Sequence, residues 1–203
     1  MKKSDFRWVF LAILGLVFFV FVSGYMISQD LNKISKDSNH SLAQDLNQTF
    51  SQGGLTFNYP SDWVNATLGD DIGGLSAAVN IGALKMPSPH HLTLYIDREN
   101  ISSNTSIEFV KEKYKGIDKN SPAAHKFQVL SDTKRIINGL VVYEVTSLEK
   151  DYASYQFVEY KHLMLLMGKD GQVVYYLEFV DHNSTFDNNR PMIDRIINTI
   201  KIQ

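Results

Sequence analysis

Residues 155–180, YQFVEYKHLMLLMGKDGQVVYYLEFV, decide the fold. Asp170-Gly171 lies near the middle and is a strong signal for a two-residue turn, which can join only antiparallel neighbours. On either side of it, segments 163–167 and 173–177 are apolar without alternation, as in strands buried on both faces. The stretch therefore predicts two antiparallel strands, Tyr155–Met167 and Gln172–Val180, with a layer of structure on each side.

Further strands are predicted before this hairpin along the chain. A second hairpin has strands at Thr133–Ile137 and Leu140–Ser147, joined by Asn138-Gly139, the strongest short turn signal. Two earlier segments, Leu55–Tyr59 and Leu92–Asp97, alternate apolar and polar residues with the period of a half-buried strand. Together these segments predict an antiparallel sheet.

Two amphipathic helices are expected to cover this sheet. Thr105-Ser106-Ile107-Glu108 fits a capping box, with Thr105 as the N-cap, and Gly116 is the expected end of that helix. A second helix is predicted to start at Asn188–Pro191, since proline is favoured in a first turn. Its apolar face is spaced at i, i+3, i+4 and i+7: Ile193, Ile196, Ile197 and Ile200. We therefore expect an α+β protein, an α/β/α sandwich around a central antiparallel sheet.

The amino-terminal segment predicts a membrane anchor. Residues 8–27 form an uncharged apolar run of 20 residues, which is long enough for a helix to cross a bilayer. Lys2, Lys3 and Arg7 precede it and only Asp5 opposes them, which predicts a cytoplasmic amino terminus and an extracytoplasmic carboxy-terminal domain. The chain is therefore expected to be a single-pass protein of the cell membrane.

Two interpretations of this segment stay open. The favoured one is an uncleaved signal anchor, and the other is a signal peptide removed near Val22-Ser23-Gly24. The expected organisation is then an anchor at 1–27, a polar stalk at 28–52 and a folded extracytoplasmic domain at 53–203.

Composition excludes several classes of function. The 203 residues suit one ordinary domain with an appendage, and the net charge of −2 gives no electrostatic basis for binding nucleic acid. The chain has no cysteine, which excludes disulfides, thiol catalysis, iron–sulfur clusters and cysteine-based zinc sites.

Six Asn-x-Ser/Thr triplets follow the apolar segment, more than chance composition predicts. They agree with an exported surface that carries glycans, although a chain rich in Asn and Ser produces such triplets without any glycosylation. The candidate acceptors are Asn39, Asn47, Asn65, Asn100, Asn104 and Asn183.

No complete catalytic or metal-binding pattern is found. His90 and His91 would point to opposite faces of a strand, so they are expected to be exposed loop residues rather than ligands of one metal. Asp181-His182 resembles half of a catalytic pair but has no nucleophile motif beside it. Ser76 lies in an incomplete nucleophile elbow, and Asp70-Asp71 near Asp62 is an acidic loop that resembles a calcium site only weakly. We predict no catalytic residue, no metal and no cofactor.

Two larger sets of residues are given structural interpretations. Basic residues interleaved with acidic ones are expected to form a solvated helix face: Lys111, Lys113, Lys115, Lys119 and Lys126. Aromatic residues in the second half are mostly expected to lie in the core or in cross-strand pairs: Tyr152, Tyr155, Phe157, Tyr160, Tyr175, Tyr176 and Phe179.

The stretch Gly54–Trp63, GLTFNYPSDW, resembles the opening strand and turn of PsbP-like domains. The ending is also similar, with a strand at Gln172–Val180 leading to a helix that closes with IINTIKI at residues 196–202. The resemblance covers about residues 50–203 and implies an α/β/α sandwich. It also implies a non-enzymatic role and a likeness to membrane-anchored prokaryotic relatives.

The sequence thus predicts a membrane-anchored, extracytoplasmic binding or accessory module of the cell envelope, with no catalytic activity. Its expected partners are the membrane, through residues 8–27, and an unidentified envelope protein. The alternative is a structural subunit of a surface assembly, such as a pilin, and a hydrolase is the third possibility.

Overall fold

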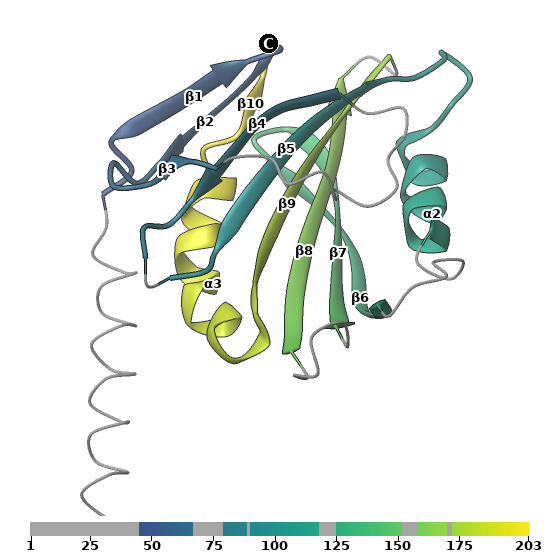
Figure 1. Ribbon diagram of the computed structural model, residues 1–203. Coiled ribbons are helices and arrows are strands. Elements are labelled where there is room, and N and C mark those ends of the chain that lie inside the picture. The colour runs from purple at the N-terminus through teal and green to yellow at the C-terminus, as the bar shows by residue number, and fades with distance from the viewer. Residues whose placement is uncertain (1–44, 67–78, 89, 118–124, 152–157, 170–171) are drawn as a thin grey trace, which may run out of the picture. The chain divides into compact units, whose positions relative to one another are not determined.

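A seven-stranded antiparallel sheet forms the centre of the computed structural model, which describes residues 45–66, 79–88, 90–117, 125–151, 158–169 and 172–203 (Figure 1). The strand order is β3-β4-β5-β9-β8-β7-β6. Their bounds are β3 Val64–Asn65, β4 Val79–Lys85, β5 Thr93–Asn100, β6 His125–Ile137, β7 Leu140–Asp151, β8 Val158–Lys169 and β9 Val173–His182.

A second, smaller sheet lies beside the main one. It contains β1 (Gln48–Gln52), β2 (Leu55–Tyr59) and β10 (Lys201–Ile202), in the order β1-β2-β10 and with antiparallel pairing. The carboxy-terminal strand therefore pairs with a strand from the beginning of the domain. Two helices complete the described part of the chain, α2 (Ile107–Ile117) and α3 (Asn183–Ile197).

The two central strands are buried on both faces, as predicted. β8 pairs with β9 in antiparallel register, so that Leu165 lies opposite Leu177. Alternate residues along β8 enter different cores: Leu163 and Leu165 belong to one, and Met164 and Leu166 to the other. The predicted turn at residues 170–171 lies outside the described residues, and the last described pair of the two strands is Lys169 with Val173.

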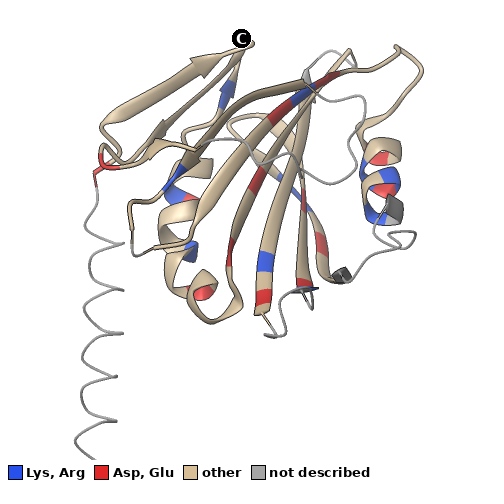
Figure 2. Cartoon of the chain, in the orientation of Figure 1, with Lys and Arg blue, Asp and Glu red and all other residues tan. Residues whose placement is uncertain are grey.

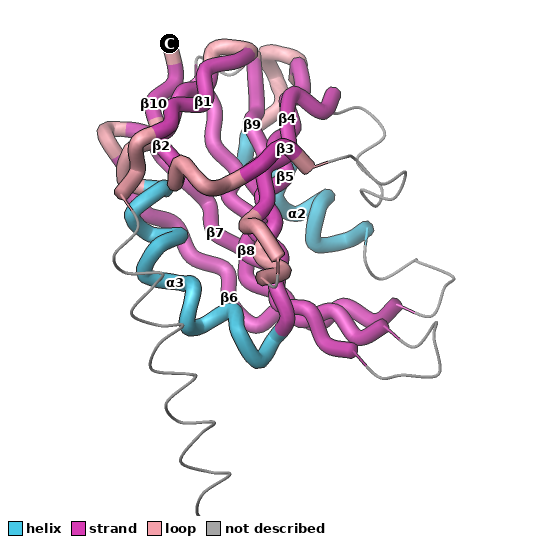
Figure 3. The backbone as a smooth tube through the Cα atoms, turned by 60° about the vertical axis from the view of Figure 1, so that its left-hand side comes forward, coloured by secondary structure: helices cyan, strands magenta, loops and turns pink. Residues whose placement is uncertain are grey.

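The helices pack on opposite faces of the sheet (Figure 3). The larger core includes α3 and the small sheet, with Phe57, Phe186 and Ile196 fully buried. The smaller core includes α2, whose Val110 and Tyr114 are buried over β7, β8 and β9. The α+β class is confirmed, and the antiparallel pairing within both sheets agrees with the predicted hairpins.

Helix α3 begins earlier than the sequence predicted. It follows β9 directly at Asn183, and Pro191 lies inside it rather than in the first turn. Proline removes one intrahelical hydrogen bond. Burial of Phe186 and Asn189, ahead of the proline, provides packing that holds this first half in place. The four isoleucines expected on the apolar face are all buried, although Ile200 lies beyond the helix end.

The start of helix α2 also differs from the prediction. Ser106, not Thr105, caps the helix, because its Oγ accepts a hydrogen bond from the Phe109 N–H at 3.1 Å. The Thr105 hydroxyl instead lies 2.7 Å from the hydroxyl of Ser102. Gly116 does not end the helix, which is described as far as Ile117.

The Asn138-Gly139 turn is confirmed. Both residues have positive φ, 50° and 80°, as a type I′ hairpin turn requires. Both strands that it joins are longer than predicted. In β6 a bulge between Val129 and Ser131 interrupts the alternation that would have marked its first half, and β7 continues past Ser147 to Asp151.

Neither described helix combines the length and the apolar character needed to cross a bilayer. Residues 8–27 lie outside the described residues, so the predicted anchor stays a prediction. The predicted stalk extends too far, because Gln48–Gln52 form β1 and pair with β2 in the folded domain.

Candidate functional site

A cluster of ionisable side chains lies on the face of the main sheet that α2 covers. His162 on β8 is 7% exposed, and its Nδ1 lies 2.9 Å from Oε1 of Glu178 on β9. Its Nε2 lies 2.9 Å from Oε2 of Glu149 on β7. The Tyr114 hydroxyl, on the helix α2 that covers this face, donates a hydrogen bond to the same Glu178 oxygen at 3.2 Å. We call these four residues the His162 cluster.

The cluster holds its histidine in the charged form. Burial alone would lower the pKa of His162, because it penalises the imidazolium. The hydrogen bonds with Glu149 and Glu178 outweigh burial and raise the pKa of His162 to about 9. At neutral pH the ring is therefore an imidazolium that donates from both nitrogens, one to each carboxylate.

This arrangement restricts the chemistry of His162. An imidazolium has no free lone pair, so it cannot accept a proton as a general base near neutral pH. The two carboxylates lie at opposite ring nitrogens, so the three side chains do not converge on one point. Accordingly, no group of three His, Asp or Glu residues among the described residues could hold a metal ion. The cluster fits a structural task, in which one imidazolium partly compensates the charges of two carboxylates inside the fold.

Further acidic groups extend the cluster along β5. Asp97 is 5% exposed, and its Oδ1 accepts a hydrogen bond from Asn80 Nδ2 at 2.9 Å. Burial raises the pKa of Asp97, the bond from Asn80 lowers it, and the nearby charge of Glu178 raises it further. Glu99 accepts a short hydrogen bond from the hydroxyl of Tyr176.

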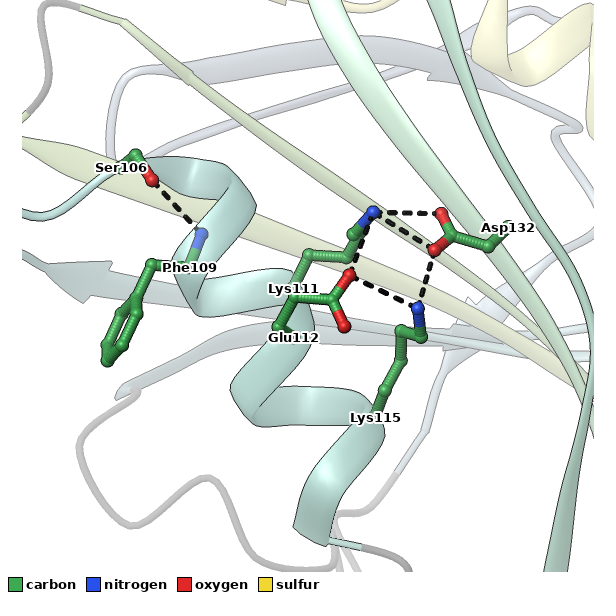
Figure 4. A network of polar contacts seen from close by, with 6 residues as sticks. All are labelled: Ser106, Phe109, Lys111, Glu112, Lys115 and Asp132. Carbon is green, nitrogen blue, oxygen red and sulfur yellow. Dashed lines mark hydrogen bonds and ion pairs between the residues drawn. The ribbon is translucent and has the colours of Figure 1, made fainter.

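A second network attaches α2 to the sheet (Figure 4). Lys111 Nζ lies 3.1 and 3.0 Å from the two carboxylate oxygens of Asp132 on β6, and Lys115 Nζ lies 2.6 Å from Asp132 Oδ2. Glu112 Oε1 is 3.2 Å from both ammonium groups. Figure 2 shows charges of both signs along α2.

This network corrects the prediction of a solvated lysine face. Lys111 is only 7% exposed, and its ammonium group also lies 5.1 Å from the centre of the Tyr143 ring. Lys113 is exposed as predicted, whereas Lys119 and the side chain of Lys126 lie outside the described residues. The spacing of the lysines in the sequence could not show that Lys111 is buried while Lys113 is exposed, because the burial of Lys111 depends on where Asp132 lies in β6.

The Asp181-His182 pair is not arranged as a catalytic dyad. Asp181 is 1% exposed and accepts hydrogen bonds from the His182 backbone N–H and from Asn189 Nδ2, both at 2.8 Å. These bonds fix the junction of β9 and α3. The His182 ring instead contacts the rings of His91 and Tyr160, with centroids 4.4 and 4.9 Å apart.

The remaining candidates are only partly placed. His90 and His91 lie in the loop before β5, where His91 is exposed as predicted but His90 is half-buried. The incomplete elbow with Ser76 and the acidic pair Asp70-Asp71 lie outside the described residues, and Asp62 is exposed. Of the aromatic residues, Tyr175, Tyr176 and Phe179 are in the core as expected, Tyr160 is half-buried, and Tyr152, Tyr155 and Phe157 are outside the described part.

The glycosylation candidates remain predictions. Four acceptors are exposed in the structure: Asn47, Asn65, Asn100 and Asn104. Asn183 is half-buried at the start of α3, and its Nδ2 donates to Glu159 Oε2 at 2.9 Å. Asn39 lies outside the described residues.

No sequence pattern singled out the His162 cluster. One local signal was available, because Glu178 is a charged residue within a run, residues 173–180, that is otherwise apolar or aromatic. A carboxylate inside such a run requires a partner on one face of the sheet. Its partner could not be identified locally, since His162 is 16 residues away.

Comparison with known proteins gives a family match over nearly the whole chain. Residues 8–202 match the family described as PsbP-like protein. A search of curated proteins finds no match.

Two solved structures have the same fold. The cyanobacterial PsbP protein (CyanoP) of Synechocystis is 16% identical, with a TM-score of 0.58, over 77% of this chain and 92% of that protein. LpqN of Mycobacterium tuberculosis, described as involved in cell envelope biogenesis, is 11% identical. Its TM-score is 0.52, over 77% of this chain and 90% of that protein. At these identities the likeness establishes the fold alone.

Proposed function

Because the chain belongs to the family of PsbP-like proteins, we propose that it is a non-catalytic binding or accessory module of the cell envelope. It is anchored in the membrane by residues 8–27, with the folded domain, which includes β1 at Gln48–Gln52, on the extracytoplasmic side. Its partner is a protein of the same envelope. LpqN, which has this fold, is itself described as involved in cell envelope biogenesis.

The main support for a non-catalytic role is the hydrogen bonding of the His162 ring. Its cluster is the most enzyme-like group of side chains in the described residues, yet both ring nitrogens are bonded to carboxylates. A general base needs a free lone pair and a pKa near the working pH. The raised pKa, about 9, and the buried position support a structural task instead.

The absence of cysteine allows a direct test of the location. Two variants of the full chain each carry one cysteine, Ser61→Cys in the exposed turn after β2 and Ser4→Cys before the apolar run. Intact cells are treated with a membrane-impermeant maleimide. We expect labelling of the Ser61→Cys variant in intact cells, and labelling of the Ser4→Cys variant only after permeabilisation.

The matched pair also separates the two interpretations of the amino terminus. If the segment is an uncleaved anchor, the Ser4→Cys label stays on a membrane protein of full length. If it is a removed signal peptide, the mature protein carries no label at that position. Protection of the Ser61→Cys variant until lysis would contradict the extracytoplasmic placement.

The non-catalytic role has its own test. His162→Gln and Glu178→Gln should leave association with the envelope partner unchanged wherever the variants remain folded at the assay temperature. Loss of this association in a variant with an unaltered melting curve would contradict the purely structural task of the cluster, because the residue would then contribute to function and not only to stability.

A further inference from the structure

In the part of the chain that the structure describes, the two sheets have four outer edges, and these edges differ in the features that prevent pairing with another strand. β3 and β10 end their sheets with only two residues each. β6, the other edge of the main sheet, is long, but it contains a bulge and carries charged residues. Short length, bulges and charges are the usual devices that prevent strands from adding at an edge.

β1 has none of these devices. It has five residues, Gln48–Gln52, with no charge and no proline, and it pairs with β2 in unbroken register. No described strand pairs with its outer side. Within the described ranges, therefore, no strand uses the backbone N–H and C=O groups of β1 that point away from β2.

The position of β1 is fixed by packing. Phe50 stacks on Phe57 of β2, with ring centroids 4.9 Å apart. It also lies where a side chain at Gly82 would be, since a Cβ added there would come within 2.7 Å of the Phe50 ring. Thr49 and Ser51 are exposed, on the opposite side of the strand from Phe50.

The sequence of β1 is nearly the same in both directions: Gln48-Thr49-Phe50-Ser51-Gln52. If two such strands pair antiparallel about a two-fold axis at Phe50, each Gln48 lies opposite Gln52 of the second copy. Each Thr49 lies opposite Ser51 of the second copy, and the two Phe50 residues face each other. Cross-strand pairs of hydroxyl residues and of aromatic residues are favourable, and no like charges meet.

We propose that β1 is the contact through which two copies of this chain form a dimer, by antiparallel pairing of β1 with β1 of the second copy. A two-fold contact uses the same surface on both copies, so a self-complementary strand is what it requires. The two small sheets then become one sheet of six strands.

Cysteine cross-linking tests the pairing and its register in the cysteine-free full chain, purified in detergent. Thr49→Cys and Ser51→Cys are made on chains with tags of different size. On mild oxidation, the mixture should give the covalent heterodimer, because these two positions face each other across the contact. Each variant alone should give much less dimer, since its two cysteines are then offset along the strands. Efficient self-cross-linking of Thr49→Cys, or none in the mixture, would overturn the proposal.

Introducing charges at Thr49 and Ser51 provides an independent test, with the dissociation constant of the dimer measured by analytical ultracentrifugation. The double variant T49K/S51K places two lysine–lysine pairs across the contact and should raise the dissociation constant by at least about tenfold. The control T49K/S51E changes the same exposed positions but forms two lysine–glutamate pairs, so it should remain dimeric. Both variants lose Thr49, which completes the Asn47 triplet, so a glycan cannot explain a difference between them. A monomeric wild type, as would result if another segment of this chain covers β1, or equal behaviour of the two variants would contradict the proposal.

Discussion

The ammonium group of Lys111 on α2 lies 3.0 Å from carboxylate oxygen Oδ2 of Asp132 on β6. This ion pair connects the helix to the edge of the main sheet, and the lysine is almost fully buried. Apart from Val110 and Tyr114, α2 places few side chains in the core beneath it. The position of the helix therefore depends on this polar contact as well as on apolar packing.

Replacing Lys111 with alanine should loosen α2. The change leaves Asp132 with one of its two lysine partners and removes the contact with the Tyr143 ring. We expect a loss of about 2 kcal/mol in the free energy of unfolding, as for hydrogen bonds to charged groups, and faster hydrogen exchange in α2. Lys113→Ala, on the exposed side of the same helix, is the control. Equal exchange rates in the two variants would show that the ion pair does not hold the helix.

The His162 cluster predicts a specific loss of stability at alkaline pH. Because the folded pKa of His162 is about 9, above the ordinary 6.5, the protonated ring stabilises the fold fully below pH 6.5. That contribution, about 3 kcal/mol, is lost as pH rises from 6.5 through 9. Urea unfolding of the full chain in detergent should show this fall in wild type but not in His162→Gln. The same slope in both proteins would contradict it, and His91→Gln at an exposed histidine should behave like wild type.

Asn138 should contribute to stability in two separable ways. Its positive φ favours Asn or Gly, and its Nδ2 donates to the carbonyls of Asn198 and Ile200, both at 2.9 Å. Asn138→Gly keeps the backbone conformation and loses the two bonds, at a cost of about 1–2 kcal/mol. Asn138→Ala should cost about 1 kcal/mol more, because alanine is strained at positive φ. Thermal melting measures both changes, and a glycine variant as stable as wild type would show that the bonds contribute nothing.

Trp63 should be a major element of the larger core. It is 5% exposed, so Trp63→Ala should reduce the free energy of unfolding by about 3–5 kcal/mol. The neighbouring Val64 is 48% exposed, and Val64→Ala should change it by no more than about 0.5 kcal/mol. Similar melting curves for the two variants would place the Trp63 ring outside the core.

Local patterns in the sequence predicted most of the strands and the Asn138-Gly139 turn. Alternation, unbroken apolar runs and turn residues depend on positions a few residues apart, which a single chain displays directly. The same patterns misplaced the start of α3, because Pro191 is a strong local signal for a first turn. The burial of Phe186 and Asn189, which sustains the helix before the proline, is a tertiary effect.

The His162 cluster could not have been predicted from such local sequence patterns. Glu149 and Glu178 are 13 and 16 residues from His162 and lie on the two neighbouring strands. Their meeting depends on the register of β7, β8 and β9 and on which face each side chain occupies. Even Glu178, visible as a charge within an apolar run, did not identify its partner.

By itself the sequence determined the α+β class, the antiparallel hairpins and the excluded chemistries, since these follow from composition and short-range periodicity. The tertiary structure alone decided that Lys111 is buried against Asp132 and that His162 is held between two carboxylates. It also decided that β1 forms an uncharged sheet edge. The physical reason is that ion pairing, burial and free backbone groups depend on which strands become neighbours, and strand pairing joins residues that are distant along the chain.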